Sequence, residues 1–165
     1  MLKKKKRKPV PFVPIDVKGG EFTFAQRLEL GSILAQKDKP EYEMFLEAIK
    51  CIYGREPVGR VEYRQAFTLW QEAIEGLAFW VKVEAEQLKY HPTADENDAG
   101  IDRFSSEVGE LGTVYSIAKA FGKDPDEILL WKYGKVFGYL RGQKAEADFQ
   151  RRYQDVMKRK SKSKK

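Results

Sequence analysis

Few side chains in this chain could bind a metal ion or act as a nucleophile, and they lie far apart. The 165 residues include one histidine, His91, and one cysteine, Cys51. A zinc site draws on several Cys, His or acidic ligands, and neither residue has such partners nearby in the sequence. The chain also lacks a phosphate-binding glycine loop and a nucleophile elbow. These residues predict a protein that is not an enzyme and has no cofactor.

The acidic segment from Asp95 to Gly100 comes nearest to a calcium-binding loop. Its glycine falls at the sixth position, as an EF-hand requires. Ala99, however, occupies the fifth position, and Ser106 stands at the twelfth, where a bidentate glutamate is needed. We therefore expect no metal ion at this segment.

The basic residues are concentrated at the two ends of the chain. Residues 1–8 contain six Lys or Arg, and residues 158–165 contain six more, with no acidic residue in either segment. Without these twelve, 19 basic residues face 25 acidic ones, so residues 9–157 carry about −6 although the whole chain carries +6. A nucleic-acid-binding domain shows its basic patch on the folded part. We expect at most weak, nonspecific nucleic-acid contact through these tails.

The apolar pattern predicts a mainly α-helical protein, a small bundle of about six helices with a possible short N-terminal β-hairpin at residues 15–24. The 42% apolar content is enough for a core, and the predicted layout has a single helical domain at residues 14–157. Its N-terminal helices occupy residues 14–90 and a C-terminal helical hairpin occupies 91–157. Residues 1–13 and 158–165 are expected to be disordered basic tails. The single cysteine indicates a reducing compartment, and no apolar run suggests a membrane span.

Two helices are expected to bury long apolar stripes. The longest, from about Val61 to Lys89, repeats apolar residues at spacings of three, four and seven, which predicts a central position in the bundle. Its stripe consists of Phe67, Trp70, Ile74, Leu77, Val81 and Leu88. The helix that ends at Gly122 has a stripe made of Leu111, Tyr115, Ala118 and Phe121.

A sharp corner follows Gly122. Asp124 is an expected N-cap, with Pro125 at the first helical position and Glu127 as a capping-box partner. Helix, glycine turn and helix form the outline of a DNA-binding helix-turn-helix, but the second helix starts with acidic and apolar residues that suit a polyanion poorly. An ordinary helical hairpin explains the same residues. The second helix is expected to bend near Tyr133 and to continue towards Met157.

That last helix carries the candidate partner-binding surface. Three glycines four residues apart either break the helix or let another backbone approach closely. Apolar residues flank them, and two aromatic residues follow on a charged helix end, which is typical of a partner surface. The candidate residues are Gly134, Val136, Phe137, Gly138, Tyr139, Leu140, Gly142, Phe149 and Tyr153.

Several segments resemble the tail assembly chaperones of phages and prophages. They are FTFAQRLELG at Phe22–Gly31, EGLAFWVKVE at Glu75–Glu84, and GTVYSIAKAFGKDPDEILLWKYGKVFGYL at Gly112–Leu140. The resemblance implies a protein without enzymatic activity in the cytoplasm of a bacterial host. It also implies two partners, the tape-measure protein and the tail-tube protein, because the family keeps the helical tape-measure protein soluble while tube subunits polymerise around it.

The sequence thus predicts an assembly chaperone that binds helical protein segments and has the capacity for self-association. Two other hypotheses stay open at this point. One is a DNA-associated protein that uses the corner and the tails, and the other is a structural component of a phage head or tail.

Overall fold

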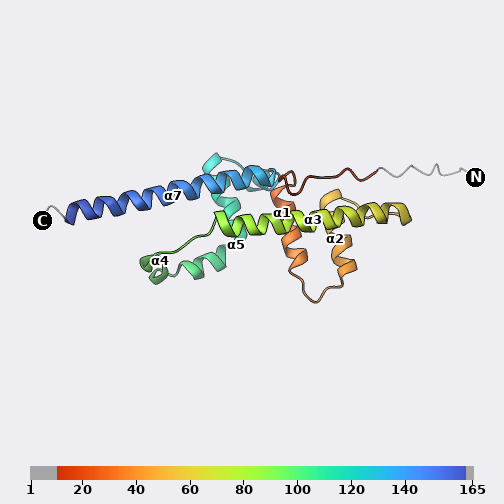
Figure 1. The fold of residues 1–165 in the computed structure, drawn as a ribbon, viewed down its shortest axis with the longest axis horizontal. Helices are drawn as coiled ribbons and strands as arrows, with labels where there is room; N and C mark the ends of the chain where they lie inside the picture. The colour runs from red at the N-terminus through yellow and green to blue at the C-terminus, as the bar shows by residue number, and fades with distance from the viewer. Residues whose placement is uncertain (1–10, 163–165) are drawn as a thin grey trace, which may run out of the picture. The chain divides into compact units, whose positions relative to one another are not determined.

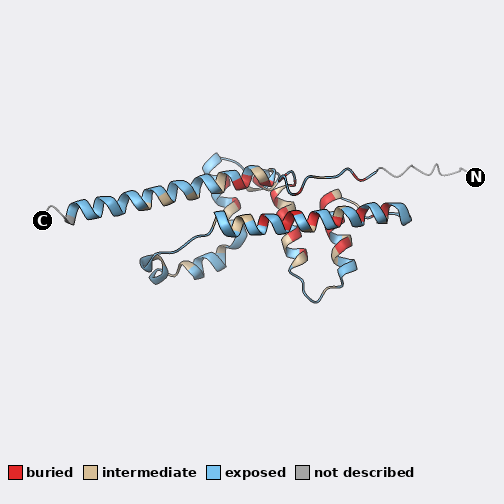
Figure 2. Cartoon of the chain, viewed as in Figure 1, coloured by how far each residue is buried: buried red, intermediate tan, exposed pale blue. Residues whose placement is uncertain are grey.

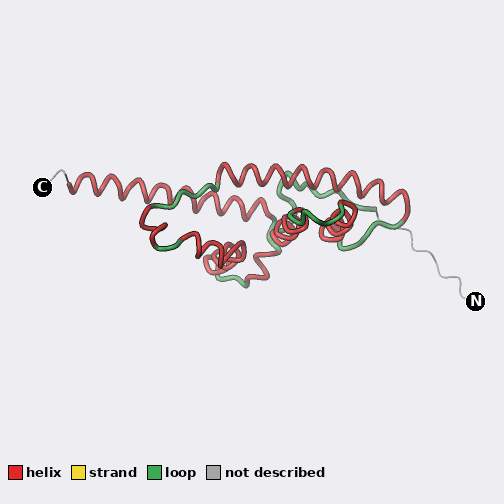
Figure 3. Tube along the Cα trace, turned by 90° about the horizontal axis from the view of Figure 1, so that it is seen from below, coloured by secondary structure: helices red, strands yellow, loops and turns green. Residues whose placement is uncertain are grey.

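The computed structural model describes residues 11–162, and these residues form a mainly α-helical protein as the sequence predicts (Figure 1). Figure 3 shows helices joined by loops, and no strand is assigned within the described residues. The helices are α1 (Phe24–Leu34), α2 (Glu41–Tyr53), α3 (Gly59–Gln87), α4 (Ala94–Asp98), α5 (Ile101–Phe121), α6 (Pro125–Leu129) and α7 (Tyr133–Lys162).

The contacts divide the chain into two compact units, and the division falls between Trp80 and Val81. The sequence pattern predicted a single domain, with its N-terminal helices ending at residue 90 and its C-terminal hairpin beginning at residue 91. The part up to Trp80 is called the N-terminal unit here, and the part from Val81 onwards the C-terminal unit. The expected tails at residues 1–10 and 163–165 lie outside the described residues.

The N-terminal β-hairpin that the sequence suggested does not form in the described residues. Residues 17–20 make a turn, closed by a hydrogen bond from the Gly20 amide to the Val17 carbonyl at 3.0 Å. Val17 and Phe22 are buried. The Val17 carbonyl also accepts a hydrogen bond from the Trp80 indole nitrogen at 2.8 Å. The Glu21 amide also donates to the Asp16 carbonyl at 3.0 Å, so the segment closes a turn without forming strands, and Val17 packs against α3.

Parts of both expected tails are ordered, namely residues 11–13 and residues 158–162. Phe12 is buried, its ring lies edge-on to that of Tyr53 at 5.0 Å, and the Arg55 guanidinium stands 4.1 Å from its centroid. At the other end, residues 158–162 continue α7 as helix. Phe12 orders its segment because a buried aromatic ring offsets the entropy of fixing a short stretch of backbone.

Helix ends agree well with the sequence because their signals are local. Thr23 and Thr93 both form the expected capping boxes, with Gln26 and Glu96. Gly122 ends α5 in the left-handed conformation that glycine accepts without strain. Asp124 caps α6, although Glu127 forms an ion pair with Lys123 and not the expected capping box. The bend expected near Tyr133 is a break between α6 and α7.

The buried faces differ more from the sequence. In α3, Trp70 and Leu77 are buried as expected, but Phe67 and Val81 are exposed. The remaining buried positions of α3 are mostly small: Ala66, Ala73 and Gly76. In α5 only Ala118 of the expected stripe is buried, whereas Leu111, Tyr115 and Phe121 are exposed. The other buried residues of α5 are Val114 and Ile117.

Within the C-terminal unit, Arg151 of α7 connects to the segment around α4. Its guanidinium donates a hydrogen bond to the His91 carbonyl at 3.0 Å and lies 3.9 Å from the Glu96 carboxylate. The same carboxylate accepts hydrogen bonds from the Thr93 amide at 2.7 Å and from the Tyr90 hydroxyl. Chiefly through the Thr93 amide, these contacts lower the pKa of Glu96 to about 2.

This network predicts an acid transition at the start of α4. The folded pKa of Glu96 lies below its ordinary value of 4.5, so the carboxylate stabilises the cap above pH 4.5 and loses that effect as the pH falls towards 2. The amide proton resonance of Thr93, followed by NMR, should titrate with a midpoint near pH 2. Glu96→Gln should abolish this titration. A midpoint near 4.5 in the wild-type chain would contradict the network.

Candidate functional site

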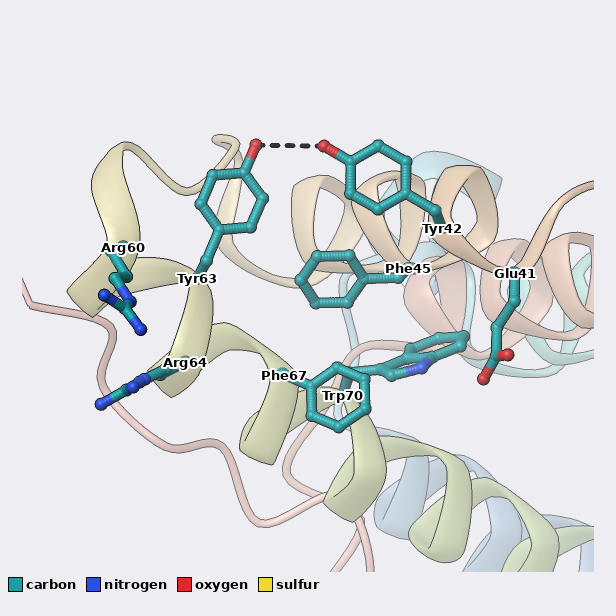
Figure 4. Close-up of a pocket in the computed structure, with 8 residues that line it drawn as sticks. All are labelled: Glu41, Tyr42, Phe45, Arg60, Tyr63, Arg64, Phe67 and Trp70. Carbon is teal, nitrogen blue, oxygen red and sulfur yellow. Dashed lines mark hydrogen bonds between the residues drawn. The ribbon is translucent and has the colours of Figure 1, made fainter.

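An aromatic groove lies on the N-terminal unit between α2 and the beginning of α3 (Figure 4). It encloses about 610 Å³. The residues that line this aromatic groove are Glu41, Tyr42, Phe45, Arg60, Tyr63, Arg64, Phe67 and Trp70. Five of the eight are aromatic, so the groove offers mainly ring surface.

Helical spacing places these rings together. Tyr63, Phe67 and Trp70 stand four and three residues apart on α3, which puts them on one face of that helix. Tyr42 and Phe45 lie three residues apart on α2. Gly54 ends α2 in the left-handed conformation, and a short loop leads to α3. The Tyr63 hydroxyl near the start of α3 lies 3.3 Å from the Tyr42 hydroxyl near the start of α2.

A buried carboxylate holds the start of α3 in place. Glu62 is buried, and its Oε2 accepts hydrogen bonds from the Arg55 guanidinium at 2.7 Å and from the Val58 amide at 2.9 Å. The Arg55 hydrogen bond is the main cause of the lowered pKa of Glu62. The loop before α3 is thus tied to its first turn, next to Arg60 and Tyr63.

Phe45 forms the centre of the groove floor. The centroid of its ring lies 6.1 to 6.4 Å from those of the four other rings. Phe45 and Trp70 are 5% and 2% exposed, whereas Tyr42 and Phe67 are 58% and 48% exposed. The groove therefore has a packed aromatic floor and an open aromatic mouth.

Polar groups lie at the rim of the groove. The hydroxyls of Tyr42 and Tyr63 are 3.3 Å apart and share a hydrogen bond, which raises the pKa of Tyr63. In Figure 4, Arg60 and Arg64 lie at one end of the cluster and Glu41 at the other. The lining is mainly ring surface with charged groups at its two ends, so the arrangement suits binding of apolar or aromatic side chains with charged neighbours.

Cys51 and His91 are the two residues whose side chains raised the question of chemistry in the sequence. Burial and the neighbouring Glu29 raise the pKa of the Cys51 thiol to about 12, so it is not a reactive thiolate. His91 is exposed and offers its backbone carbonyl to Arg151. Within residues 11–162 there is no cluster of three or more His, Cys, Asp or Glu side chains that could hold a metal ion.

The surface predicted on the last helix is only partly available. Val136 and Phe137 are buried, so they cannot contact a partner in this conformation. Gly138 and Gly142 are exposed within the unbroken helix α7, and a Cβ atom built on either would meet nothing within 4 Å. The remaining candidates are half-buried or exposed: Gly134, Tyr139 and Leu140 are half-buried, and Phe149 and Tyr153 are exposed.

The sequence pattern did not reveal the aromatic groove. Phe67 belongs to the apolar stripe predicted for its helix, so periodicity assigned it to the core. Tyr42 stands three residues before Phe45, a spacing that fits an apolar stripe equally well. A usable signal was present in the residue types. Two tyrosines and two arginines at the beginnings of consecutive helices are more typical of an interface than of a core.

The corner after α5 differs from a DNA-reading unit in one respect. The helix that would enter the major groove of DNA, α6, is five residues long, and its first turn carries the exposed acidic residues Asp126 and Glu127.

Among the described residues, none of the helices has the length and apolar composition that crossing a bilayer requires. Comparison with protein-family models, with curated proteins and with solved structures finds no match for this chain.

Proposed function

We propose that this chain is a protein-binding chaperone whose aromatic groove holds an amphipathic helix of a client. The sequence resemblance suggests the tape-measure protein of a phage tail as this client, so the role that we propose is that of a tail assembly chaperone. The tail-tube protein is the second partner in this proposal. Binding and release, without catalysis, are the whole of this activity.

The observation that carries the proposal is the half-exposed mouth of the groove. Tyr42 and Phe67 leave about half of their surface in water although they adjoin the buried rings of Phe45 and Trp70. Aromatic residues over a desolvated floor are the usual energetic centre of a protein interface. An amphipathic helix can fill such a groove with side chains spaced three and four residues apart.

The charges at the rim suggest how a client helix would be oriented. Arg60 and Arg64 are exposed at one end of the groove and Glu41 is exposed at the other. A client helix with an acidic residue beside its apolar stripe would place that residue near the arginines, since charge complementarity favours one orientation over its reverse.

Phe67→Ala tests the groove directly. The wild-type chain, co-expressed with the tape-measure protein of the same genome, should keep it soluble and should be recovered with it. Phe67→Ala should weaken binding at least about tenfold, as loss of an aromatic hot spot does. The matched control is Phe104→Ala, which removes a phenylalanine of similar exposure from α5, outside the groove.

Calorimetric titration of the purified pair measures the loss, and thermal melting shows whether each variant is folded. Equal binding by the two variants would remove the groove from the proposal. A wild-type chain that binds the tail-tube protein but not the tape-measure protein would favour a structural role in the particle. Recovery of DNA in place of either protein would favour the DNA-associated alternative.

A further inference from the structure

Residues 89–108, which we call the arm, are attached to the rest of the C-terminal unit by few contacts. The arm contains α4 and the first part of α5. None of its residues is buried, and the nearest buried positions along the chain are Trp80 and Val114. Figure 2 accordingly shows α4 and the adjoining part of α5 in pale blue and tan. Segments with few buried apolar contacts are the ones that open locally at a low cost in free energy.

The side chain of Arg151 holds the arm to α7. Its guanidinium donates a hydrogen bond to the His91 carbonyl at 3.0 Å, lies 3.9 Å from the Glu96 carboxylate, and stands 5.6 Å from the centroid of the Tyr90 ring. Within residues 11–162, no other side chain from outside the arm makes a hydrogen bond, an ion pair or a ring contact with it. We call this set of contacts the latch.

Gly109 joins the arm to the buried part of α5. Its backbone adopts φ 54° and ψ −153°, a conformation that is essentially restricted to glycine, so α5 is kinked at this residue. A Cβ atom built on Gly109 would meet nothing within 4 Å, which shows that the space around the kink is open. At the other end of the arm, residues 89–93 form a loop. The backbone can therefore turn at both ends of the arm.

The sequence keeps a helical period through the kink at Gly109. Apolar residues recur on both sides of it at spacings of three, four, three, four and three. They are Ile101, Phe104, Val108, Leu111, Tyr115 and Ala118. These spacings place all of them on one face only if the helix runs straight through Gly109. The kink divides this stripe into two halves, so the pattern fits a second conformation in which α5 is continuous.

We propose that the arm is a conformational switch with a closed and an open position. In the closed position α5 is kinked at Gly109 and the latch holds the arm to α7. In the open position α5 runs straight, the arm leaves α7, and the apolar stripe of α5 becomes continuous. Opening uncovers no buried side chain of the arm, so the two positions are close in free energy and the latch decides between them.

Removing the latch provides the first test. Nitroxide labels at Asn97→Cys and Lys158→Cys, in a Cys51→Ser background, report the distance between α4 and α7 by pulsed electron paramagnetic resonance. Arg151→Ala should lower the ratio of closed to open arm at least about tenfold, because charge-assisted contacts are lost. The open arm should appear as a longer distance. Arg152→Ala removes an exposed arginine from the same helix, so this matched control should keep the original distribution.

Changing the kink provides the second test. Alanine disfavours a positive φ angle, so Gly109→Ala should shift the arm towards the open position even with Arg151 in place. Circular dichroism should show at least as much helix as before, because alanine is the better helix former. The matched control is Gly138→Ala, which changes an exposed glycine inside the unbroken helix α7 and should leave the distance distribution unchanged.

Urea denaturation separates a switch from general destabilisation. Arg151→Ala and Gly109→Ala should both unfold at or above the midpoint of the parent chain, because neither removes a buried contact. An unchanged distance distribution in Arg151→Ala would overturn the latch, and a closed arm in Gly109→Ala would overturn the kink as the hinge. Opening that comes only with a lower urea midpoint would overturn the switch itself. These experiments contain no client, so their result is independent of the groove.

Discussion

Trp70→Ala should destabilise the protein by about 3–5 kcal/mol, the usual cost of truncating a large aromatic residue in a core. Trp70 is 2% exposed and packs edge-on against Phe45 at 6.4 Å. Alanine would leave a cavity beneath the groove, and the surrounding helices can relax into it only partly. Urea denaturation followed by circular dichroism measures the free energy of unfolding.

Phe67→Ala is the internal comparison for this experiment, since Phe67 lies one turn away on α3 but is 48% exposed. It should cost clearly less than Trp70→Ala. If Trp70→Ala loses less than about 1 kcal/mol, α3 does not bury the face described here. Client binding should fail in Trp70→Ala too, because the groove floor would be lost.

Gly76→Leu should also be strongly destabilising, at about 1–3 kcal/mol for overpacking. A Cβ atom at Gly76 would lie 2.7 Å from Val17 Cγ1 and 3.0 Å from the Lys18 backbone nitrogen. A side chain there would push the N-terminal loop away from α3. The Trp80 indole proton resonance should shift, because its hydrogen bond to the Val17 carbonyl depends on that contact.

Gly138→Leu is the matched control, since the same substitution in α7 meets nothing within 4 Å. Leucine there should be neutral or stabilising by up to about 1 kcal/mol, because glycine is a poor helix former. The melting temperatures of the two variants should therefore move in opposite directions. A normal melting temperature for Gly76→Leu would show that the loop does not pack on α3 as described.

Local features of this fold were predictable, and features that depend on packing partners were not. The capping boxes at Thr23 and Thr93 and the helix end at Gly122 follow from short sequence signals, and all are confirmed. The buried face of α5 was missed because Leu111 and Val114 both fit a helical period. Only the surrounding elements decide which of two overlapping stripes is covered.

The aromatic groove could not be predicted from the sequence for the same reason, since it depends on which elements pack together. Exposed Tyr42 and buried Phe45 look alike in a hydrophobic pattern. They differ because Phe45 lies among four other rings, whereas Tyr42 stands at the mouth of the groove. Gly76 lies inside a long helix, where glycine is a weak helix former. Its role as a contact point for the N-terminal loop involves Val17, which is far away in the chain.

The order of contacts along the chain also has a kinetic consequence. The helix pairs with most contacts are sequence neighbours: α1 with α2, α4 with α5, and α5 with α6. Local contacts require little loop closure, so these pairs should form within microseconds to milliseconds. Closing Val17 onto Trp80 spans 63 residues and is entropically slower. Docking of the N-terminal loop is therefore expected to be a late step in folding.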